Sequence, residues 1–285
     1  MSDTLTLDAP AKLNLFLRIL ARESDGFHGL ETLFCRISLS DRLTVERRPG
    51  GISIDVTGGE TGPADQNLAV RAARMVVEAT GGKFGVHLTL EKRIPVKAGL
   101  GGGSSDAAAA LLGVNQLAGN PVPKHELLQF AARLGSDVPF FLSGSSLALA
   151  WGHGERMLTL PPLPSHPALL LVSGEGVSTP EAYRWVDEDR TPGTRRGAVA
   201  MEGESVRNWG NIGRLSGNDF ESAVFGRRPE LRAAFERLAG THPLLCRMSG
   251  SGSALFAVYR SAAEREDAQM SLGRKLGQLI PVDTA

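Results

Sequence analysis

One segment of the chain combines residue types and spacing that suit phosphate binding. Residues 99–105 read Gly-Leu-Gly-Gly-Gly-Ser-Ser, and they lie between a strand-like stretch and a helix-like stretch. Glycine lets backbone N–H groups approach a ligand closely. The N-terminus of the following helix offers unpaired N–H groups and the positive end of a dipole at the same place. The segment therefore predicts an anion site, in which Ser104 or Ser105 could cap the helix or coordinate Mg²⁺.

The common phosphate-loop patterns do not fit this segment. A Walker A loop needs a lysine after the glycines, and none follows here. A dinucleotide-binding G-x-G-x-x-G pattern that starts at Gly99 would need glycine where Ser104 stands. The protein-kinase signature set is absent, and a GTP-hydrolysing switch is disfavoured because there is no Walker A loop. From the residues alone, the segment is either a phosphate site of an unspecified enzyme or a flexible turn.

Two charged residues stand in apolar surroundings. Lys12 lies in the run 10–15 on a predicted strand, where it is either at a sheet edge or directed into a site. Asp137 follows a predicted helix end and precedes a very apolar run. It either caps a short helix or serves a site. Both alternatives stay open at this point.

Two further motifs carry weaker signals. Residues 25–28 read Asp-Gly-Phe-His, which predicts a turn. A lone histidine such as His28 is more often a satisfied polar residue than a catalyst. Residues 248–253 alternate serine and glycine after Met248 and are best explained as a plain loop before a strand. The six histidines show no spacing typical of metal ligands, so no zinc site is predicted.

The composition is that of a globular protein without bulk charge. The 285 residues include 31 Lys and Arg and 31 Asp and Glu, so the formal net charge is zero. This balance disfavours binding to nucleic acid or to an anionic membrane through bulk charge. Cys35 and Cys246 form no CxxC pair, and we expect both to be small buried hydrophobes in a reducing compartment. No signal peptide or membrane-length apolar segment is recognisable, which predicts a cytoplasmic protein.

The spacing of apolar residues predicts strands and helices in mixture. Strands are expected at 5–7, 13–20, 52–56, 86–90, 147–151, 169–172 and 254–259. Helices are expected at 67–79, 104–118, 124–134, 229–238 and 262–276, and a loop at 187–205. Four prolines in 161–167 predict a stiff connector between an N-terminal domain, 1–160, and a C-terminal domain, 161–285. The predicted fold class is α+β in two lobes.

Taken together, the motifs resemble one family. Residues 10–15, 25–28, 99–106, 135–139 and 249–252 occur in the order and spacing of the 4-diphosphocytidyl-2-C-methyl-D-erythritol kinases, a family of the GHMP kinase superfamily. The glycine loop alone would indicate only the superfamily. The resemblance implies a two-lobed GHMP kinase fold with the active site in the cleft between the lobes. It also implies ATP-dependent phosphorylation of the 2-hydroxyl of 4-diphosphocytidyl-2-C-methyl-D-erythritol, a step of non-mevalonate isoprenoid synthesis.

The resemblance further implies roles for individual residues. Asp137 matches the catalytic general base, and Lys12 matches the lysine beside it that stabilises charge. ATP would be bound by Asn67, Leu68, Lys92, Pro95, Gly99, Leu100, Gly101, Gly102, Gly103, Ser104 and Ser105, with Ser104 or Ser105 as the one candidate ligand for Mg²⁺. The substrate would be bound by Asn14, Phe27, His28, Thr179 and Tyr183. The Phe27 and Tyr183 rings would lie on either side of the cytosine, with His28 at its edge.

Three positions depart from the expected pattern or stand out in it. Phe27 replaces the commoner tyrosine, which keeps the ring and loses a phenol hydrogen bond. Lys97 stands where a small residue is usual, either near the phosphates or in solvent. Asp106 brings a carboxylate to the first turn of the helix, which suits the helix dipole but repels phosphate unless Mg²⁺ intervenes.

The implied partner is a small molecule with a cytidine diphosphate group, and the sequence does not give the oligomeric state. One alternative function is another small-molecule GHMP kinase, acting on mevalonate, homoserine or a sugar, and the three residues assigned to the cytosine disfavour it. The other alternative is a non-catalytic regulator that binds nucleotide. Such a protein would need neither the lysine nor the aspartate.

Overall fold

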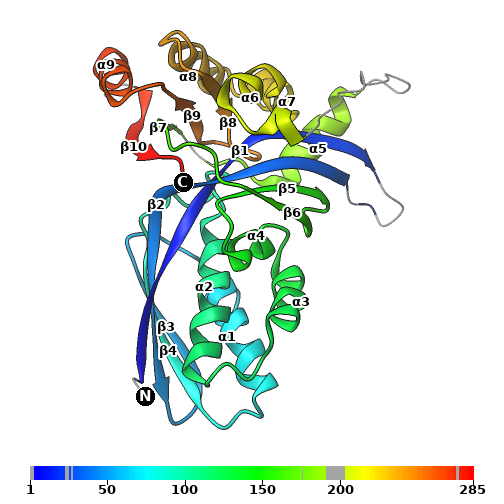
Figure 1. Ribbon diagram of the computed structural model, residues 1–285, viewed down its shortest axis with the longest axis vertical. Helices are drawn as coiled ribbons and strands as arrows, with labels where there is room; N and C mark the ends of the chain where they lie inside the picture. Colours follow the sequence, from blue (N-terminus) through cyan, green and yellow to red (C-terminus); the bar gives the residue numbers. More distant parts are fainter. Residues whose placement is uncertain (1–2, 23–25, 27, 175, 191–202, 274–275) are drawn as a thin grey trace.

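The computed structural model describes residues 3–22, 26, 28–174, 176–190, 203–273 and 276–285 (Figure 1). These residues form one six-stranded and one four-stranded β-sheet, with helices packed on both. The predicted α+β class is confirmed. Within the described part of the chain, the helices are too short or too polar to span a membrane.

The six-stranded sheet is organised around the first two strands. Its strands are β1 (Thr4–Arg22), β2 (His28–Arg48), β3 (Ile52–Thr57), β4 (Gly85–Glu91), β5 (Leu147–Gly152) and β6 (Arg156–Leu160). The neighbour order is β3-β4-β2-β5-β6, with β1 paired to β2. β2 bonds β4 with one half of its length and β5 with the other. Figure 1 shows β1 and β2 running from the lower half of the molecule into the upper half, so the two strands connect both halves.

The middle of β1 is buried on both faces. Side chains alternate along a strand, so Ala11, Leu13 and Leu15 enter the apolar core, while Lys12 and Asn14 lie on the opposite face. The register between β1 and β2 shifts close to each end of this short segment. Such bulges are common beside functional sites, where they redirect side chains. The strand thus combines a core function on one face with a polar function on the other.

Four helices cover one face of the lower part of this sheet (Figure 1). They are α1 (Leu68–Ala79), α2 (Gly102–Leu117), α3 (Lys124–Leu134) and α4 (Val138–Ser143). α2 is rich in alanine and is central, because it packs on α1, α3, α4, β1 and β2. At Gly113 the helix lies so close to the sheet that an added Cβ would be 2.8 Å from Leu7 Cδ1 and 2.9 Å from Val45 Cγ2.

The second sheet lies in the upper half of the molecule (Figure 1). Its strands are β7 (Pro167–Val172), β8 (Leu245–Met248), β9 (Leu255–Val258) and β10 (Gln278–Asp283), in the antiparallel order β10-β7-β9-β8. Its helical elements are α5 (Thr179–Asp189), η1 (Gly203–Val206), α6 (Trp209–Leu215), α7 (Phe220–Arg227), α8 (Pro229–Ala239) and α9 (Ala262–Leu272). One apolar cluster contains residues of β1 and β2 together with residues of β7 and β9. The two sheets therefore share part of their core.

Both cysteines are buried in these cores, as predicted. Burial raises the pKa of the Cys35 thiol to about 12, and it also raises the pKa of the Cys246 thiol. A thiol with a raised pKa is a poor nucleophile at neutral pH. The cysteines thus act as small apolar side chains.

Most predicted elements are present, with errors at their ends. The helices expected at 67–79, 124–134 and 229–238 agree with α1, α3 and α8 to within one residue at each end. The helix expected at 262–276 ends at Leu272, before Gly273 with its positive φ of 64°. The loop predicted at 187–205 begins too early, because α5 continues to Asp189. Residues 191–202 of this predicted loop lie outside the described part. Residues 161–166 form no helix or strand, and the division into 1–160 and 161–285 stays a prediction.

Gly113→Val is expected to lower the free energy of unfolding by about 1–3 kcal/mol, because overpacking pushes α2 away from the sheet. Urea denaturation measures this change. The matched control is Leu112→Val, which puts the same side chain at a neighbouring position that is 37% exposed. A Gly113→Val protein that is no less stable than the control would show that the helix does not need this close approach.

Candidate active site

A cavity of about 1170 Å³ lies where the glycine loop, β1, β2, α4 and α5 meet. Nearly all the residues predicted for the site line it: Lys12, Asn14, His28, Asn67, Leu68, Lys92, Pro95, Gly99, Leu100, Gly101, Gly102, Gly103, Ser104, Asp137, Thr179 and Tyr183. Ser105 is buried and is not among the lining residues. Phe27 and the turn predicted around it lie largely outside the described residues.

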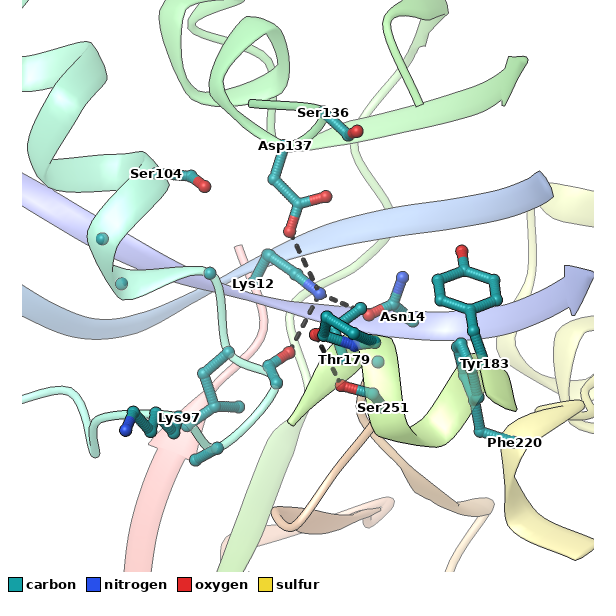
Figure 2. A pocket seen from close by; sticks show the side chains of 18 of the residues that line it. Lys12, Asn14, Lys97, Ser104, Ser136, Asp137, Thr179, Tyr183, Phe220 and Ser251 are labelled. Carbon is teal, nitrogen blue, oxygen red and sulfur yellow. Dashed lines mark hydrogen bonds and ion pairs between the residues drawn. The ribbon is translucent and has the colours of Figure 1, made fainter. Parts of the chain in front are cut away.

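Lys12 is at the centre of this cavity, and its side chain is almost fully buried. Its ammonium donates hydrogen bonds to the backbone oxygen of Gly99 (2.9 Å) and to Oδ1 of Asn14, and it lies 3.6 Å from Oδ2 of Asp137 (Figure 2). Burial lowers the pKa of Lys12, and the charge of Asp137 opposes that shift. Of the two alternatives for this residue, the structure supports a side chain directed into a site.

Asp137 stands immediately before α4, in the N-cap position. Its carboxylate makes no capping hydrogen bond to the helix and points toward Lys12 instead (Figure 2). The capping alternative is therefore wrong. The Asp137 side chain is 29% exposed, so a ligand in the cavity can reach the carboxylate while the neighbouring ammonium is covered.

The glycine loop leads directly into α2. Gly99 and Gly101 have φ values of 77° and 73°, in the left-handed region that favours glycine. A Cβ on Gly99 would be 2.0 Å from the backbone oxygen of Ser249, so the loop packs tightly on the second glycine-serine segment. That segment is a loop, as expected, and its residues Gly250 and Ser251 also line the cavity.

The two serines after the glycines differ in position. α2 begins at Gly102 with Gly101 as its N-cap, so the prediction that Ser104 or Ser105 caps the helix is wrong. Ser104 lines the cavity, and its hydroxyl is directed to the side on which Asp137 lies (Figure 2). Ser105 is buried and its hydroxyl has no hydrogen-bond partner in the described structure. The geometry therefore favours Ser104 over Ser105 as a ligand-contacting hydroxyl.

A second buried charge cluster lies beneath the first turn of α2. The ammonium of Lys92 bonds carboxylate oxygens of Asp41 and of Asp106, the latter at 2.8 Å. Asp41 also accepts the backbone N–H groups of Arg93 (2.5 Å) and Ile94 (2.8 Å). A Cβ on Gly102 would be 3.1 Å from Nζ of Lys92. The cluster thus fixes the chain that enters the glycine loop and holds a positive charge close to the start of α2.

Two carboxylates share this single ammonium. Burial raises the pKa of Asp106 to about 7. The positive charge of Lys92 lowers this pKa, and the negative charge of Asp41 raises it further. Oδ1 of Asp106 is buried and has no hydrogen-bond partner among the described groups. Sequence reasoning missed Asp41, because it is 51 residues from Lys92 and nothing in its local sequence marks it.

Asn67, Leu68 and Pro95, which are predicted to bind ATP, line the cavity together with the glycine loop, and a Cβ on Gly103 would be 3.8 Å from Cδ1 of Leu68. Asn67 caps α1, since its Oδ1 accepts the N–H of Ala69 at 2.9 Å. Leu68 and Pro95 lie nearby in the lining. Lys97 is exposed, and in Figure 2 its ammonium points away from Lys12. Its backbone has a φ of 57°, which is unusual for a residue other than glycine.

The other end of the cavity is aromatic. The rings of His28 and Tyr183 stack with centroids 5.1 Å apart and an angle of 11° between their planes. Phe220 contacts the Tyr183 ring edge-on at 4.9 Å. Nε2 of His28 lies 2.8 Å from Oδ1 of Asp187. Burial raises the pKa of Tyr183 to about 12, so its phenol is neutral at physiological pH.

Hydrogen bonds between distant segments hold two other lining residues in place. Asn14 Nδ2 donates to Oγ1 of Thr32 at 2.8 Å, and Thr32 in turn donates to the backbone oxygen of Phe16. The hydroxyl of Thr179, at the start of α5, lies 3.0 Å from the hydroxyl of Ser251. Thr32, Ser251, Phe220 and Asp187 were not predicted as site residues, since each acquires its role through a contact far along the chain.

The fold and the site define a kinase of the GHMP class. A family model described as "GHMP kinases N terminal domain" matches residues 67–145, and one described as "GHMP kinases C terminal" matches residues 199–278. A crystal structure of a 4-(cytidine 5'-diphospho)-2C-methyl-D-erythritol kinase is similar with a TM-score of 0.82, 38% identity and 99% coverage of both chains. The expected two-lobed GHMP kinase fold is confirmed.

Curated relatives narrow the class to one family. A 4-diphosphocytidyl-2-C-methyl-D-erythritol kinase of Solibacter usitatus is 41% identical over 89% of this chain and 81% of its own length. The enzyme of the same name from Moorella thermoacetica is 40% identical over 95% of both chains. The chain therefore belongs to the 4-diphosphocytidyl-2-C-methyl-D-erythritol kinase family, as its motifs predicted.

The charge cluster under α2 predicts a pH-dependent stability. The pKa of Asp106 is about 7 in the folded protein against an ordinary value of 3.8. Between about pH 4 and pH 7 the folded state holds a proton that the unfolded state has released, so this group makes the free energy of unfolding fall as pH rises. In Asp106→Asn that contribution is absent. The free energy of unfolding of the variant minus that of the parent protein is therefore expected to increase from about pH 4 to about pH 7.

Urea denaturation at several pH values measures the difference. The control is Asp267→Asn, which removes an exposed carboxylate from α9 and should show no such trend. If the difference between Asp106→Asn and the parent protein is the same at every pH, the carboxyl of Asp106 is ionised in the folded state.

Proposed function

We propose that this protein transfers the γ-phosphoryl group of ATP to the 2-hydroxyl of 4-diphosphocytidyl-2-C-methyl-D-erythritol, a step of non-mevalonate isoprenoid synthesis. The observation that carries the proposal is the pair Lys12–Asp137, which lies in one cavity between the glycine loop and an aromatic end. Family membership supports the choice of acceptor, since the relatives are named for it.

Asp137 is proposed as the general base. Phosphoryl transfer passes through a loose transition state, so positioning and charge neutralisation dominate. An ordinary carboxylate is a weak base for an alcohol, and a late proton transfer removes the need for a strong one. The carboxylate would orient the attacking hydroxyl by accepting its hydrogen bond and then take its proton as the new P–O bond forms.

Lys12 is proposed to stabilise charge. Its hydrogen bonds to Gly99 and Asn14 hold the ammonium beside Asp137 and next to the glycine loop. A positive charge there attracts the phosphoryl group as it moves between donor and acceptor. Because the ammonium is buried, water screens that attraction little.

The glycine loop and α2 are proposed to hold the ATP phosphates. The left-handed glycines and the start of α2 line the cavity, where their backbone N–H groups would bind phosphate oxygens. Ser104 lines the cavity and offers a hydroxyl oxygen of the kind that Mg²⁺ binds, and Mg²⁺ in kinases needs few protein ligands because phosphates and water complete its shell. Mg²⁺ bound there would neutralise phosphate charge. Asn67, Leu68 and Lys92 would lie around the adenine.

The cytidine end of the substrate is proposed to lie at the aromatic end of the cavity. Tyr183 offers a neutral ring for stacking, and His28 offers a ring nitrogen at its side. Thr179 and Asn14 lie between this end and Lys12, where they could position the methylerythritol unit. Phe27 would provide the second ring.

The principal test measures ADP release with Mg-ATP and four acceptors: 4-diphosphocytidyl-2-C-methylerythritol, mevalonate, homoserine and galactose. Turnover is expected with the cytidyl compound alone. In Asp137→Asn, kcat is expected to fall by about 10²- to 10⁴-fold, the usual effect of removing a general base, with ATP binding kept.

Asp267→Asn is the matched control and should leave kcat unchanged. An unchanged kcat in Asp137→Asn would remove this residue from the role of base. Turnover with one of the other three acceptors instead would favour a different small-molecule kinase, and ATP binding without turnover on any of them would favour a non-catalytic regulator.

Tyr183→Ala is expected to raise KM for the cytidyl substrate by roughly 5- to 150-fold, because stacking contributes about 1–3 kcal/mol per base. KM for ATP should change little. Tyr183→Phe keeps the ring and serves as the control that retains most of the affinity. An equal rise in KM for both nucleotides would contradict the assignment of this end of the cavity to cytosine.

A further inference from the structure

Helix α5 holds the imidazole of His28 from two directions. Tyr183 and Asp187 are four residues apart on α5, so their side chains lie on the same face of the helix. The Tyr183 ring lies nearly parallel to the imidazole and fixes its plane. The Asp187 carboxylate bonds Nε2 at 2.8 Å and fixes the rotation of the ring within that plane. The His28 side chain is 5% exposed and lines the cavity, so its orientation is set before a ligand binds.

The hydrogen bond to Asp187 also assigns the ring proton. An ionised carboxylate can only accept a hydrogen bond, so Nε2 must carry the hydrogen. In the neutral imidazole the other nitrogen, Nδ1, then carries a lone pair and acts as an acceptor. Without the carboxylate, the two neutral tautomers would interchange and Nδ1 would present a donor for part of the time.

The neighbouring acids on α5 have different partners. Glu181 lies 3.6 Å from Arg184, and Glu188 lies 2.9 Å from Arg227. Asp187 and Glu188 both line the cavity, but of the two it is Asp187 that bonds the histidine. The roles of these acids therefore differ, although all are carboxylates of the same helix.

We propose that Asp187 is a specificity-determining residue that acts through His28. By holding the proton on Nε2 it makes Nδ1 an acceptor, which suits the 4-amino group of cytosine and opposes the 4-oxo group of uracil. The inference rests on the proposed function, because it requires a pyrimidine at this end of the cavity. Cytosine carries a hydrogen-bond donor at position 4, whereas uracil carries an acceptor there. When an acceptor of the protein faces an acceptor of the ligand, neither atom has a hydrogen-bond donor. The site therefore binds that ligand much more weakly than one that supplies the donor.

The test is the binding of CDP and of UDP, measured by titration calorimetry, with ATP as an internal reference. The parent protein is expected to bind CDP at least about 10-fold more tightly than UDP. In Asp187→Ala, the affinity for CDP is expected to fall by about 5-fold, the usual effect of one hydrogen bond, while the affinity for UDP stays the same or rises. The ratio of the two affinities therefore narrows, and the affinity for ATP does not change.

Two further variants separate this role from simple packing. Asp187→Asn keeps a side-chain oxygen that can accept from Nε2, so it is expected to retain most of the discrimination. Glu181→Ala removes a carboxylate from the same helix away from the cavity, and it should leave both affinities unchanged.

The ¹⁵N chemical shifts of the His28 ring report the tautomer directly, and His28→Gln assigns the signals. The parent protein and Asp187→Asn are expected to show the form protonated at Nε2, and Asp187→Ala a mixture. An Asp187→Ala protein that keeps the original CDP-to-UDP ratio, or one that loses affinity for both equally, would overturn this inference alone. A parent protein that binds neither CDP nor UDP would overturn the proposed substrate together with it.

Discussion

Lys12 places a positive charge where little water reaches it, and the arrangement of the whole site follows from how that charge is compensated. A buried ammonium without partners is costly, so each of its donors needs an acceptor. The acceptors come from different parts of the chain: Asn14 from β1, the backbone of Gly99 from the glycine loop, and Asp137 from the start of α4. The same contacts that satisfy the charge therefore bring the Asp137 carboxylate and the glycine loop together.

The glycine loop is confined by two ammonium groups. Lys12 lies on one side, where a Cβ on Gly101 would be 3.1 Å from its Cγ, and Lys92 lies on the other, close to Gly102. Lys92 is held by Asp41, which also binds two backbone N–H groups of the chain entering the loop. A Cβ on Gly101 would also be 2.9 Å from Cζ of Phe141, and the φ of Gly101 is 73°. Crowding and backbone conformation therefore both favour glycine at this position.

The long strands explain why one cavity can hold two chemically different ends. β1 and β2 extend through both halves of the molecule, and α5 from the upper half packs its polar face against the start of β2 (Figure 1). One part of the cavity is lined by the glycine loop and charged side chains, while the aromatic end is made by Tyr183, His28 and Phe220.

Features that depend on neighbours along the chain could be predicted before the fold was known. Helical spacing located α1, α3 and α8, and the five motifs taken together identified the family, because backbone conformation and apolar period are local properties. The direction in which a charged side chain points emerges only in the folded molecule. Asp137 was equally compatible with a helix cap, and the carboxylates of Asp41 and Asp187 gave no signal, since their partners are 51 and 159 residues away. Pairing of buried charge depends on which segments the fold brings together, and no local pattern records that.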